Sequence, residues 1–402
     1  MKTRIFTDDF GEAAMIIKNG GLVAVPTETV YGLACNGLDE GAVKEIYEVK
    51  GRPAVKPLSL MVPDKEAMKK YCEDVPPQAE YLADKFWPGP LTIVLKSRAV
   101  VPDIVRAGGK TVGLRCPDHP MTLKTLRAAG VPFAAPSANP SGEESPKNAQ
   151  KVAEYFNGKI DGIIDGGACG IGRESTIIDM SAVPYKILRH GALSETEIAR
   201  TLADKLKIIG ITGGTGCGKT TALNVLRSYG ALVIDCDEVY HLLLESSTEM
   251  KNELSDEFPG CLTDAGVDRK YIGRVVFGNK EALEKLNTIT HRYVRAEVER
   301  LLREYAMTGG HIAAIDAIEL FSSGVSGMCQ CTLGVVSDRE KRIARIVKRD
   351  NISEEYAASR VDAQHPNEYF EEKCTYILTN NGEQTLFENN CNKLFKEILK
   401  NE

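Results

Sequence analysis

A glycine-rich segment near the middle of the chain has the residue types and the spacing of a phosphate-binding loop. It reads Gly213-Gly-Thr-Gly-Cys-Gly-Lys-Thr220, it follows the apolar run Lys207–Thr212, and a helical pattern over residues 221–227 follows it. Glycines let backbone N–H groups curl around phosphate oxygens, the lysine reaches the β- and γ-phosphates, and the threonine hydroxyl binds Mg²⁺. This context favours an ATP or GTP site over an ordinary glycine-rich turn. The residues that the pattern assigns to the nucleotide are Gly214, Thr215, Gly216, Cys217, Gly218, Lys219, Thr220 and Thr221.

Two aspartates after the next apolar run could act on the bound nucleotide. Residues 231–237 have the pattern of a strand that ends in two carboxylates, and Asp235 and Asp237 are alternate residues, so that both side chains would point the same way. Carboxylates at the carboxyl end of a strand lie where open α/β sheets bind ligands. One could accept a hydroxyl proton and the other could orient water around Mg²⁺, and a solvated turn is the alternative.

Three arginines further along could neutralise the charge of a transferring phosphoryl group. Arg342, Arg345 and Arg349 fall at spacings that share one helix face. A solvated basic helix is the alternative, and the phosphate-binding loop upstream favours a lid over the nucleotide.

The first half of the sequence lacks such a loop, but seven of its segments carry side chains that suit phosphate. Each alone has an ordinary explanation, such as a turn cluster or cations that offset a helix dipole. Because all seven occur in one domain, we interpret them as parts of one nucleotide site. The segments are 26–33, 50–53, 87–92, 111–115, 134–142, 175–176 and 189–191.

Apolar strand-like runs alternate with amphipathic helical stretches throughout, which predicts α/β architecture. Ser194 and Glu197 have capping-box spacing, so a helix should begin there and run to about Leu202. A new strand then opens the nucleotide-binding half, and we place the domains at residues 1–203 and 204–402. The other predicted strands are 22–25, 91–95 and 112–114, and the predicted helices are 12–19 and 42–49.

Composition excludes several classes of protein. The formal net charge is −6, so the chain as a whole has no pull towards nucleic acid or anionic lipid. The 11 cysteines are scattered without zinc-ligand spacing, which predicts free thiols in a reducing cytoplasm. We find no signal-peptide pattern and no apolar run long enough for a membrane span, and we expect a cytoplasmic protein with no membrane partner.

From Lys207 to Lys400 the chain resembles dephospho-CoA kinases. It departs from the usual family pattern at His291-Arg292, where His-Pro is usual, and from Asp316 to Ser322, where "DIPLLFE" is usual, which leaves the contacts to CoA unassigned. The resemblance is carried by residues 211–220, 233–237, 286–291, 314–316, 345–350, 360, 364 and 380–382.

The resemblance implies a doubly wound parallel sheet of the P-loop type with a helical lid. Asp237 would be the base that acts on the ribose 3′-hydroxyl of dephospho-CoA, and Lys219 would hold the triphosphate. Thr220 and Asp235 would hold Mg²⁺, and Arg345 and Arg349 would belong to a lid over ATP.

Residues 1 to about 200 resemble the YrdC-like family of threonylcarbamoyl-AMP synthases. The likeness rests on Pro-Thr-Glu-Thr-Val-Tyr-Gly-Leu at residues 26–33, on paired Lys50 and Arg52, and on paired Ser137 and Asn139. The further matching segments are 87–92, the strand that ends at residue 115, 175–179 and 189–192. The extra C-terminal domain of longer family members is absent, and the kinase-like half stands in its place.

This second resemblance implies a twisted, mostly parallel α/β sheet with a large open cavity. The implied reaction joins L-threonine, bicarbonate and ATP into threonylcarbamoyl-AMP and pyrophosphate, for threonylcarbamoyladenosine modification of tRNA. Candidate partners are therefore tRNA and a threonylcarbamoyl transferase downstream.

The implied reaction also explains the residue types of the first half. A carbamate carboxylate must attack the α-phosphate, so cations must offset crowded negative charge. We expect Lys50, Arg52 and Arg189 to bind phosphate, and Arg115 to bind the threonine carboxylate through both arms of its guanidinium. Positioning would supply most of the rate, without a nucleophilic residue. The expected hydrogen-bond donors to ATP are Thr111, Ser137, Asn139 and Ser145, and those that complete the threonine pocket are Thr29 and Ser175.

Two alternatives belong to other classes of protein. The first half could be a double-stranded-RNA-binding module, but the near-neutral charge and the complete set of motifs favour a synthase. The second half could be another P-loop small-molecule kinase, for example one acting on nucleosides. Asp235 and Asp237, with the series from Arg345 to Gln364, favour dephospho-CoA.

Overall fold

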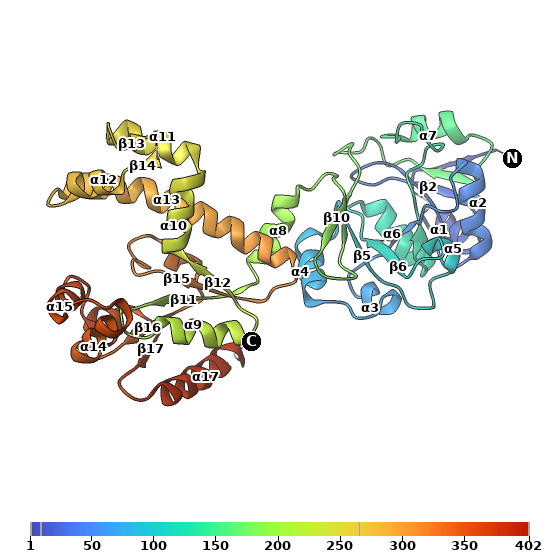
Figure 1. Cartoon of the computed structure of the whole chain (residues 1–402). Helices are drawn as coiled ribbons and strands as arrows, with labels where there is room; N and C mark the ends of the chain where they lie inside the picture. Colours follow the sequence, from blue (N-terminus) through green and yellow to red (C-terminus); the bar gives the residue numbers. More distant parts are fainter. Residues whose placement is uncertain (1, 9, 265, 401–402) are drawn as a thin grey trace. The chain divides into compact units, whose positions relative to one another are not determined.

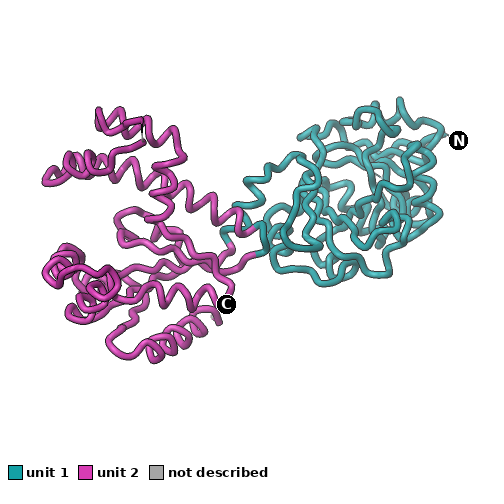
Figure 2. Tube along the Cα trace, in the orientation of Figure 1, with its two compact units in different colours: residues 1–204, 307–309 teal, residues 205–306, 310–402 magenta. Residues whose placement is uncertain are grey.

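The computed structural model describes residues 2–8, 10–264 and 266–400. The chain forms two compact units, which Figure 2 shows in two colours. Unit 1 comprises residues 1–204 and 307–309, and unit 2 comprises residues 205–306 and 310–402. Both units are α/β bodies, so the fold class predicted from the alternating pattern is confirmed.

Unit 1 is built on one ten-stranded sheet in the order β1-β8-β2-β3-β7-β4-β6-β5-β9-β10 (Figure 1). Its strands are β1 (Arg4–Phe6), β2 (Val23–Val25), β3 (Gly32–Asn36), β4 (Ser59–Met61), β5 (Leu91–Lys96), β6 (Thr111–Arg115), β7 (Phe133–Ala134), β8 (Gly162–Ile164), β9 (Thr176–Asp179) and β10 (Lys186–Arg189).

This sheet is mixed, and the expectation of a mostly parallel sheet was wrong. Four strand pairs are parallel. Five pairs are antiparallel. Short connections explain the difference, because strands joined by a short loop, such as β2 and β3 or β9 and β10, can pair only in opposite directions.

Helices cover the sheet of unit 1 and bury its core. The helix α1 packs against α6, and both contribute to a core with β2, in which Ala13, Ile17 and Val23 are fully buried. The helices of this unit are α1 (Phe10–Lys18), α2 (Glu40–Lys50), α3 (Ala67–Tyr71), α4 (Pro77–Phe86), α5 (Asp103–Arg106), α6 (Pro120–Ala129), α7 (Ala149–Phe156) and α8 (Glu195–Ala203).

The predicted capping box is present at the start of α8. The Ser194 hydroxyl oxygen accepts a hydrogen bond from Glu197 N, and the Glu197 carboxylate accepts one from Ser194 N. This helix start could be predicted from a short stretch of sequence, because two side chains three residues apart decide where the helix begins.

Unit 2 contains a five-stranded parallel sheet in the order β12-β15-β11-β16-β17. The predicted strand over Lys207–Thr212 is confirmed as β11. The connections within a parallel sheet need crossovers. α-Helices supply three of the four here, and the connection from β15 to β16 contains only the short 3-10 helix η1 (Val325–Met328). The remaining strands of this sheet are β12 (Leu232–Asp235), β15 (Ile312–Asp316), β16 (Cys331–Val336) and β17 (Tyr376–Thr379), and a separate hairpin consists of β13 (Leu262–Thr263) and β14 (Gly266–Val267).

Most helices of unit 2 belong to three packed clusters. The first, α9 with α17, packs on β11 and β16 around Leu226, Phe387 and Phe395 (Figure 1). A second cluster joins α10, α11, α12 and α13, and a third joins α14 with α15. These helices are α9 (Lys219–Ser228), α10 (Cys236–Ser246), α11 (Thr248–Glu257), α12 (Arg269–Val276), α13 (Lys280–Met307), α14 (Arg339–Asp350), α15 (Glu354–Asp362), α16 (Asn367–Lys373) and α17 (Gln384–Lys400).

The cysteines and the lengths of the apolar helices were also subjects of prediction. All eleven cysteines carry free thiols, as predicted. Within the described residues, every helix is too short or too polar to serve as a membrane span.

Candidate functional sites

The glycine-rich segment of unit 2 forms a tight loop between β11 and α9. Gly213, Gly216 and Gly218 have positive φ angles of 142°, 81° and 107°, which favour glycine strongly. A Cβ atom at Gly218 would collide with Asn380, and one at Gly213 would collide with the carbonyl of Val335. The loop is therefore shaped by its glycines and packed closely against its neighbours, and the helix dipole of α9 points into it.

Side chains from the α14–α16 region occupy part of this loop. The Thr215 N–H donates to Gln364 Oε1 at 2.8 Å, and Gln364 Nε2 donates to the Thr215 hydroxyl oxygen at 3.0 Å. Arg342 Nη2 donates to the same Gln364 Oε1 at 2.7 Å. The amide oxygen of Gln364 thus takes a backbone N–H of the kind that binds phosphate oxygens in such loops.

The three arginines of α14 do not act as one group. Arg342 Nε donates to Thr215 O at 3.0 Å, and Arg345 Nη1 donates to Gly216 O at 3.1 Å. Arg349 instead pairs with Asp350, at 2.6 Å from Nε to Oδ1, and its side chain is mostly exposed. Arg349 does not contact the loop, because it lies one helical turn beyond Arg345 and next to Asp350, and its place in a lid over ATP stays a prediction.

The two predicted carboxylates do not alternate along a strand. The strand β12 ends at Asp235, and Asp235 is the N-cap of α10, where its Oδ1 accepts hydrogen bonds from Asp237 N and Glu238 N. Asp237 lies in the first turn of α10 and is exposed. Aspartate is a preferred N-cap residue, and this tendency overrode the strand periodicity that we had assumed.

A third carboxylate faces the loop lysine. Asp316 ends β15 beside Asp235 of β12, and its Oδ1 lies 3.7 Å from Lys219 Nζ, which also donates to Gly213 O at 3.1 Å. Burial, opposed by the charge of Lys219 and assisted by the nearby Asp235 and Asp237, raises the pKa of Asp316 to about 6. Asp316 and Lys219 therefore form a nearly buried pair at the edge where the loop opens.

These groups suit Mg²⁺, which prefers hard oxygen ligands and usually takes one or two carboxylates together with phosphates. Thr220, in the first turn of α9, has an exposed side chain. Within the described residues, the buried Oδ1 of Asp316 has no hydrogen-bond partner. This oxygen faces Lys219 Nζ at 3.7 Å without a hydrogen bond, so it has room to take part in binding a metal beside the loop.

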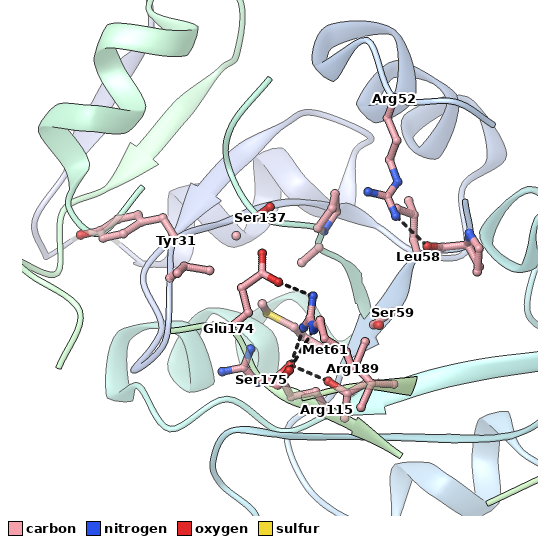
Figure 3. A pocket seen from close by; sticks show the side chains of 17 residues that line it. Tyr31, Arg52, Leu58, Ser59, Met61, Arg115, Ser137, Glu174, Ser175 and Arg189 are labelled. Carbon is pink, nitrogen blue, oxygen red and sulfur yellow. Dashed lines mark hydrogen bonds and ion pairs between the residues drawn. The ribbon is translucent and has the colours of Figure 1, made fainter. Parts of the chain in front are cut away.

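Unit 1 contains a cavity that gathers side chains from distant segments. It holds about 800 Å³ of free space, counting the part open to solvent. Arg52, Arg115 and Arg189 line it together with Ser137 and Ser175 (Figure 3). Five of the predicted site residues therefore share one cavity, although they come from the ends of α2, β6, β7, β9 and β10.

Local structure explains how Arg52 reaches the cavity. Gly51 ends α2 in the left-handed conformation, with φ of 60°, and turns the chain just before Arg52. The guanidinium of Arg52 donates to Pro57 O at 3.1 Å. Its partners among the described residues are backbone carbonyls, so its charge is available to an anion.

Arg115 is held by an ion pair that the sequence analysis did not include. Its Nη2 donates to Glu28 Oε1 at 2.7 Å and to the Thr29 hydroxyl oxygen at 2.8 Å, and its Nε lies 3.3 Å from Gly89 O. Asp118 N donates to the other oxygen of Glu28 at 3.0 Å. Thr29 is fully buried and supports Arg115, while one arm of the guanidinium, Nη1, has no partner within the described residues.

A second network joins the other predicted residues. Arg189 Nη1 donates to Glu174 Oε2 at 2.6 Å, and Arg189 Nη2 donates to the Ser175 hydroxyl oxygen at 3.0 Å. The Ser175 hydroxyl is 2.9 Å from that of Thr92, and the Ser145 hydroxyl donates to Glu174 Oε1 at 3.1 Å. Glu174 thus connects Ser145 to Arg189, and Arg189 in turn connects to Ser175.

Lys50 and Asn139 hold the loop that carries Ser137 to the cavity. Lys50 is only 4% exposed, and its Nζ donates to the carbonyl oxygens of Ser137 and Asn139. The Asn139 Nδ2 donates to Pro140 O and Glu143 O, at 3.0 and 2.8 Å. Neither side chain is among the residues that line the cavity, so the structure shows them as supports of the Ser137 loop, and their contact with ATP stays a prediction.

Thr111 lies away from the cavity. It begins β6, whereas Arg115, which lines the cavity, ends that strand. Four residues of strand separate the two by roughly 13 Å. The expected hydrogen bond from Thr111 to ATP in this cavity therefore lacks support, because a shared strand places two residues in line and not at the same point.

Two family models match the chain. One, described as "Telomere recombination" and covering the Sua5, YciO and YrdC proteins, matches residues 15–191, and the other, described as dephospho-CoA kinase, matches residues 207–385. A threonylcarbamoyl-AMP synthase of Pyrococcus abyssi is 50% identical over 48% of this chain and 56% of its own length. A putative threonylcarbamoyl-AMP synthase of Methanocaldococcus jannaschii is 39% identical over 46% of this chain and 86% of its own length. A dephospho-CoA kinase of Bdellovibrio bacteriovorus is 32% identical over 49% of this chain and 100% of its own length.

The chain belongs to both families. It spans only about half the length of the first curated relatives of unit 1. Among solved structures, P. abyssi Sua5 complexed with L-threonine aligns with 30% identity, over 82% of this chain and 97% of that chain, with a TM-score of 0.49. The sequence relatives assign the threonylcarbamoyl-AMP synthase family to unit 1 and the dephospho-CoA kinase family to unit 2.

Several acidic residues of the two sites were not predicted, because the expected site residues were chosen as cations and hydrogen-bond donors to phosphate. Glu28 and Glu174 pair with two of the cavity arginines, and both stand inside segments that we had selected or directly beside them. Asp316 was visible as an acid at the end of the apolar run 312–315, which is the same signal that drew attention to Asp235. Gln364 was among the residues that carry the resemblance to dephospho-CoA kinases, but its contact with Thr215 was not predicted, because the two residues are far apart in sequence.

We expect the buried amine of Lys50 to make the stability of unit 1 depend on pH. Burial lowers the pKa of Lys50 to about 7, whereas an unfolded lysine keeps its proton until roughly pH 10. The unfolded state therefore binds more protons between these values, and stability should rise by about 3 kcal/mol from pH 7 to pH 9.5 relative to Lys50→Met. Urea unfolding followed by the fluorescence of Trp87, the single tryptophan, measures this in unit 1.

The matched control for this experiment is Lys56→Met, which changes an exposed lysine of the following loop. Its pH dependence should match that of the unsubstituted protein. Equal slopes for the unsubstituted protein and Lys50→Met would show that Lys50 keeps its proton in the folded state.

Proposed function

We propose that the chain is a bifunctional enzyme. Residues 1–203 would form threonylcarbamoyl-AMP from L-threonine, bicarbonate and ATP, and residues 204–402 would phosphorylate the 3′-hydroxyl of dephospho-CoA with ATP. The observation that carries the first activity is the cavity in which three arginines meet three serines. The one that carries the second is the glycine-rich loop whose lysine faces Asp316.

The cavity of unit 1 supports the first reaction by its charge and by its fixed hydrogen bonds. Arg52 and Arg189 would bind phosphate oxygens of ATP, with Ser137 as a donor, and would stabilise charge that develops as the carbamate attacks. Arg115 would bind the threonine carboxylate through its remaining arm, with Ser175 beside it. Because Glu28 and Thr29 already fix Arg115, this guanidinium loses little freedom when threonine binds.

The loop of unit 2 supports phosphoryl transfer. Its backbone N–H groups and Lys219 would hold the triphosphate, and Arg345 at the loop would add positive charge. Asp237, exposed at the start of α10, would accept the proton of the 3′-hydroxyl. When bound, Mg²⁺ would neutralise phosphate charge, and Thr220 and Asp235 would hold it together with the neighbouring Asp316.

The product of unit 1 is an activated adenylate that must pass to an acceptor amine. A tRNA adenosine and a transferase that carries out this step are the partners that fit such a product. The two reactions share ATP but no intermediate.

The test incubates the full chain with ATP, Mg²⁺, L-threonine, bicarbonate and dephospho-CoA, and identifies all products by mass spectrometry. We expect CoA with ADP, and threonylcarbamoyl-AMP with pyrophosphate. CoA alone would contradict the proposal for unit 1 and would favour an RNA-binding role. A phosphorylated nucleoside in place of CoA, with nucleosides offered as competing acceptors, would contradict the proposal for unit 2.

A further inference from the structure

The cavity of unit 1 contains a single acidic side chain. Among its seventeen described lining residues, Glu174 is the one carboxylate, and it lies among three arginines. Figure 3 shows its carboxylate directed into the cavity with a contact to the Arg189 guanidinium. An acid at this point is unexpected, because it stands where a triphosphate would bring further negative charge.

Glu174 is able to change partners. Its two oxygens lie 2.6 Å from Arg189 Nη1 and 3.1 Å from the Ser145 hydroxyl. The side chains of the pair are 38% and 40% exposed, and an ion pair this open contributes less than about 1 kcal/mol. Its main chain is fixed, since Ala192 N donates to Glu174 O at 2.9 Å. The carboxylate can therefore turn to a new partner while its backbone stays in place.

The other acid near the cavity behaves differently. Glu28 has both oxygens engaged, by Arg115 Nη2 and by Asp118 N, and its side chain is only 12% exposed. It would lose nearly buried hydrogen bonds if it turned to a ligand, which is costly. Glu174 is consequently the carboxylate of this site that is open to a ligand.

A carboxylate beside a triphosphate is favourable when a divalent cation lies between them. Without the cation, the two groups repel each other, and with it both are attracted to the same ion. Mg²⁺ is usually bound by one or two carboxylates together with substrate phosphates. Glu174 fits this role, while Arg52 and Arg189 remain for phosphate oxygens that the ion does not reach.

We propose that Glu174 is the protein ligand of the Mg²⁺ ion that accompanies ATP in the cavity of unit 1. This inference rests on the function proposed for unit 1. Glu174 would give up its contact with Arg189 when it takes the metal, and Arg189 would then turn to phosphate. Ser145 would continue to orient the carboxylate by donating to its other oxygen.

The test uses Mn²⁺ as the metal probe and pyrophosphate as the anion. The full chain carries Lys219→Ala, which weakens binding at the loop of unit 2, and is compared with and without Glu174→Gln. Electron paramagnetic resonance of free Mn²⁺ gives the metal affinity in the presence of pyrophosphate. Calorimetry without metal gives the affinity for pyrophosphate alone. Glu154→Gln, which removes an exposed surface carboxylate of α7, is the matched control.

We expect Glu174→Gln to lower the Mn²⁺ affinity by at least about tenfold, a loss typical of disturbed metal sites, without weakening metal-free pyrophosphate. Glu154→Gln should change neither. Unchanged Mn²⁺ affinity would overturn the inference, and tighter metal-free pyrophosphate with unchanged Mn²⁺ would show that Glu174 is only a counter-ion of Arg189. If the parent protein made no threonylcarbamoyl-AMP and bound no pyrophosphate, the proposed function itself would fail.

Discussion

Replacing Lys219 by alanine should lower CoA formation by about 10²–10³-fold and leave threonylcarbamoyl-AMP formation nearly unchanged. Lys219 lies in the loop, where its Nζ contacts Gly213 O and faces Asp316. Removing the amine takes away the cation that would offset phosphate charge during transfer. The measurement is the rate of each product from one reaction mixture, followed by mass spectrometry.

The control for this variant is Lys396→Ala, which changes an exposed lysine of α17. It should leave both rates unchanged. Loss of both activities in folded Lys219→Ala protein would refute independent sites, and an unchanged rate of CoA formation would place phosphoryl transfer away from this loop.

Replacing Arg115 by alanine should destabilise unit 1 by about 3 kcal/mol, because it leaves the nearly buried carboxylate of Glu28 without its charged partner. The Arg115 and Glu28 side chains are only 9% and 12% exposed. Unfolding in urea, followed through the fluorescence of Trp87, measures the loss in unit 1. The double variant Arg115→Ala, Glu28→Gln should recover part of it, because no uncompensated charge remains.

Arg115→Lys separates binding from stability. It keeps a positive charge for Glu28 but removes the second guanidinium arm that would bind the threonine carboxylate, so the KM for threonine should rise about tenfold while kcat changes little. Arg98→Lys, on the same unit but outside the cavity, is the control. A fall in kcat at unchanged KM would show that Arg115 acts on the reacting phosphate of ATP and not on the carboxylate of threonine.

Locally encoded features were predictable from the sequence. The capping box at Ser194 and the strand Lys207–Thr212 depend on residues close together in the chain, and both are present. Pairing directions in the sheet of unit 1 were not predictable, because partners such as Arg4 and Gly162 meet across most of the unit. Residue types do not show which distant strand a segment will join.

The directions of individual side chains were also not predictable from the sequence. Lys50 ends α2, and the sequence could not show that its amine turns to the Ser137 loop instead of the cavity. Asp235 satisfied two patterns at once, a strand end and a helix cap, and the cap decided where Asp237 lies. The acids Glu28 and Glu174 were overlooked because cations placed close together need carboxylates when no ligand is present, a requirement of the folded state and not of a motif.

The hydrogen bond from Thr215 N to Gln364 Oε1 has a kinetic meaning. If ATP binds at this loop as proposed, a phosphate oxygen replaces Gln364 Oε1 as the acceptor of the Thr215 N–H. Gln364 must therefore leave before the phosphate can bind. At high ATP concentration the observed rate of binding would then stop rising and level off at the rate at which Gln364 leaves the loop. The speed of nucleotide capture in unit 2 would be set by the segment between α15 and α16, and not by diffusion.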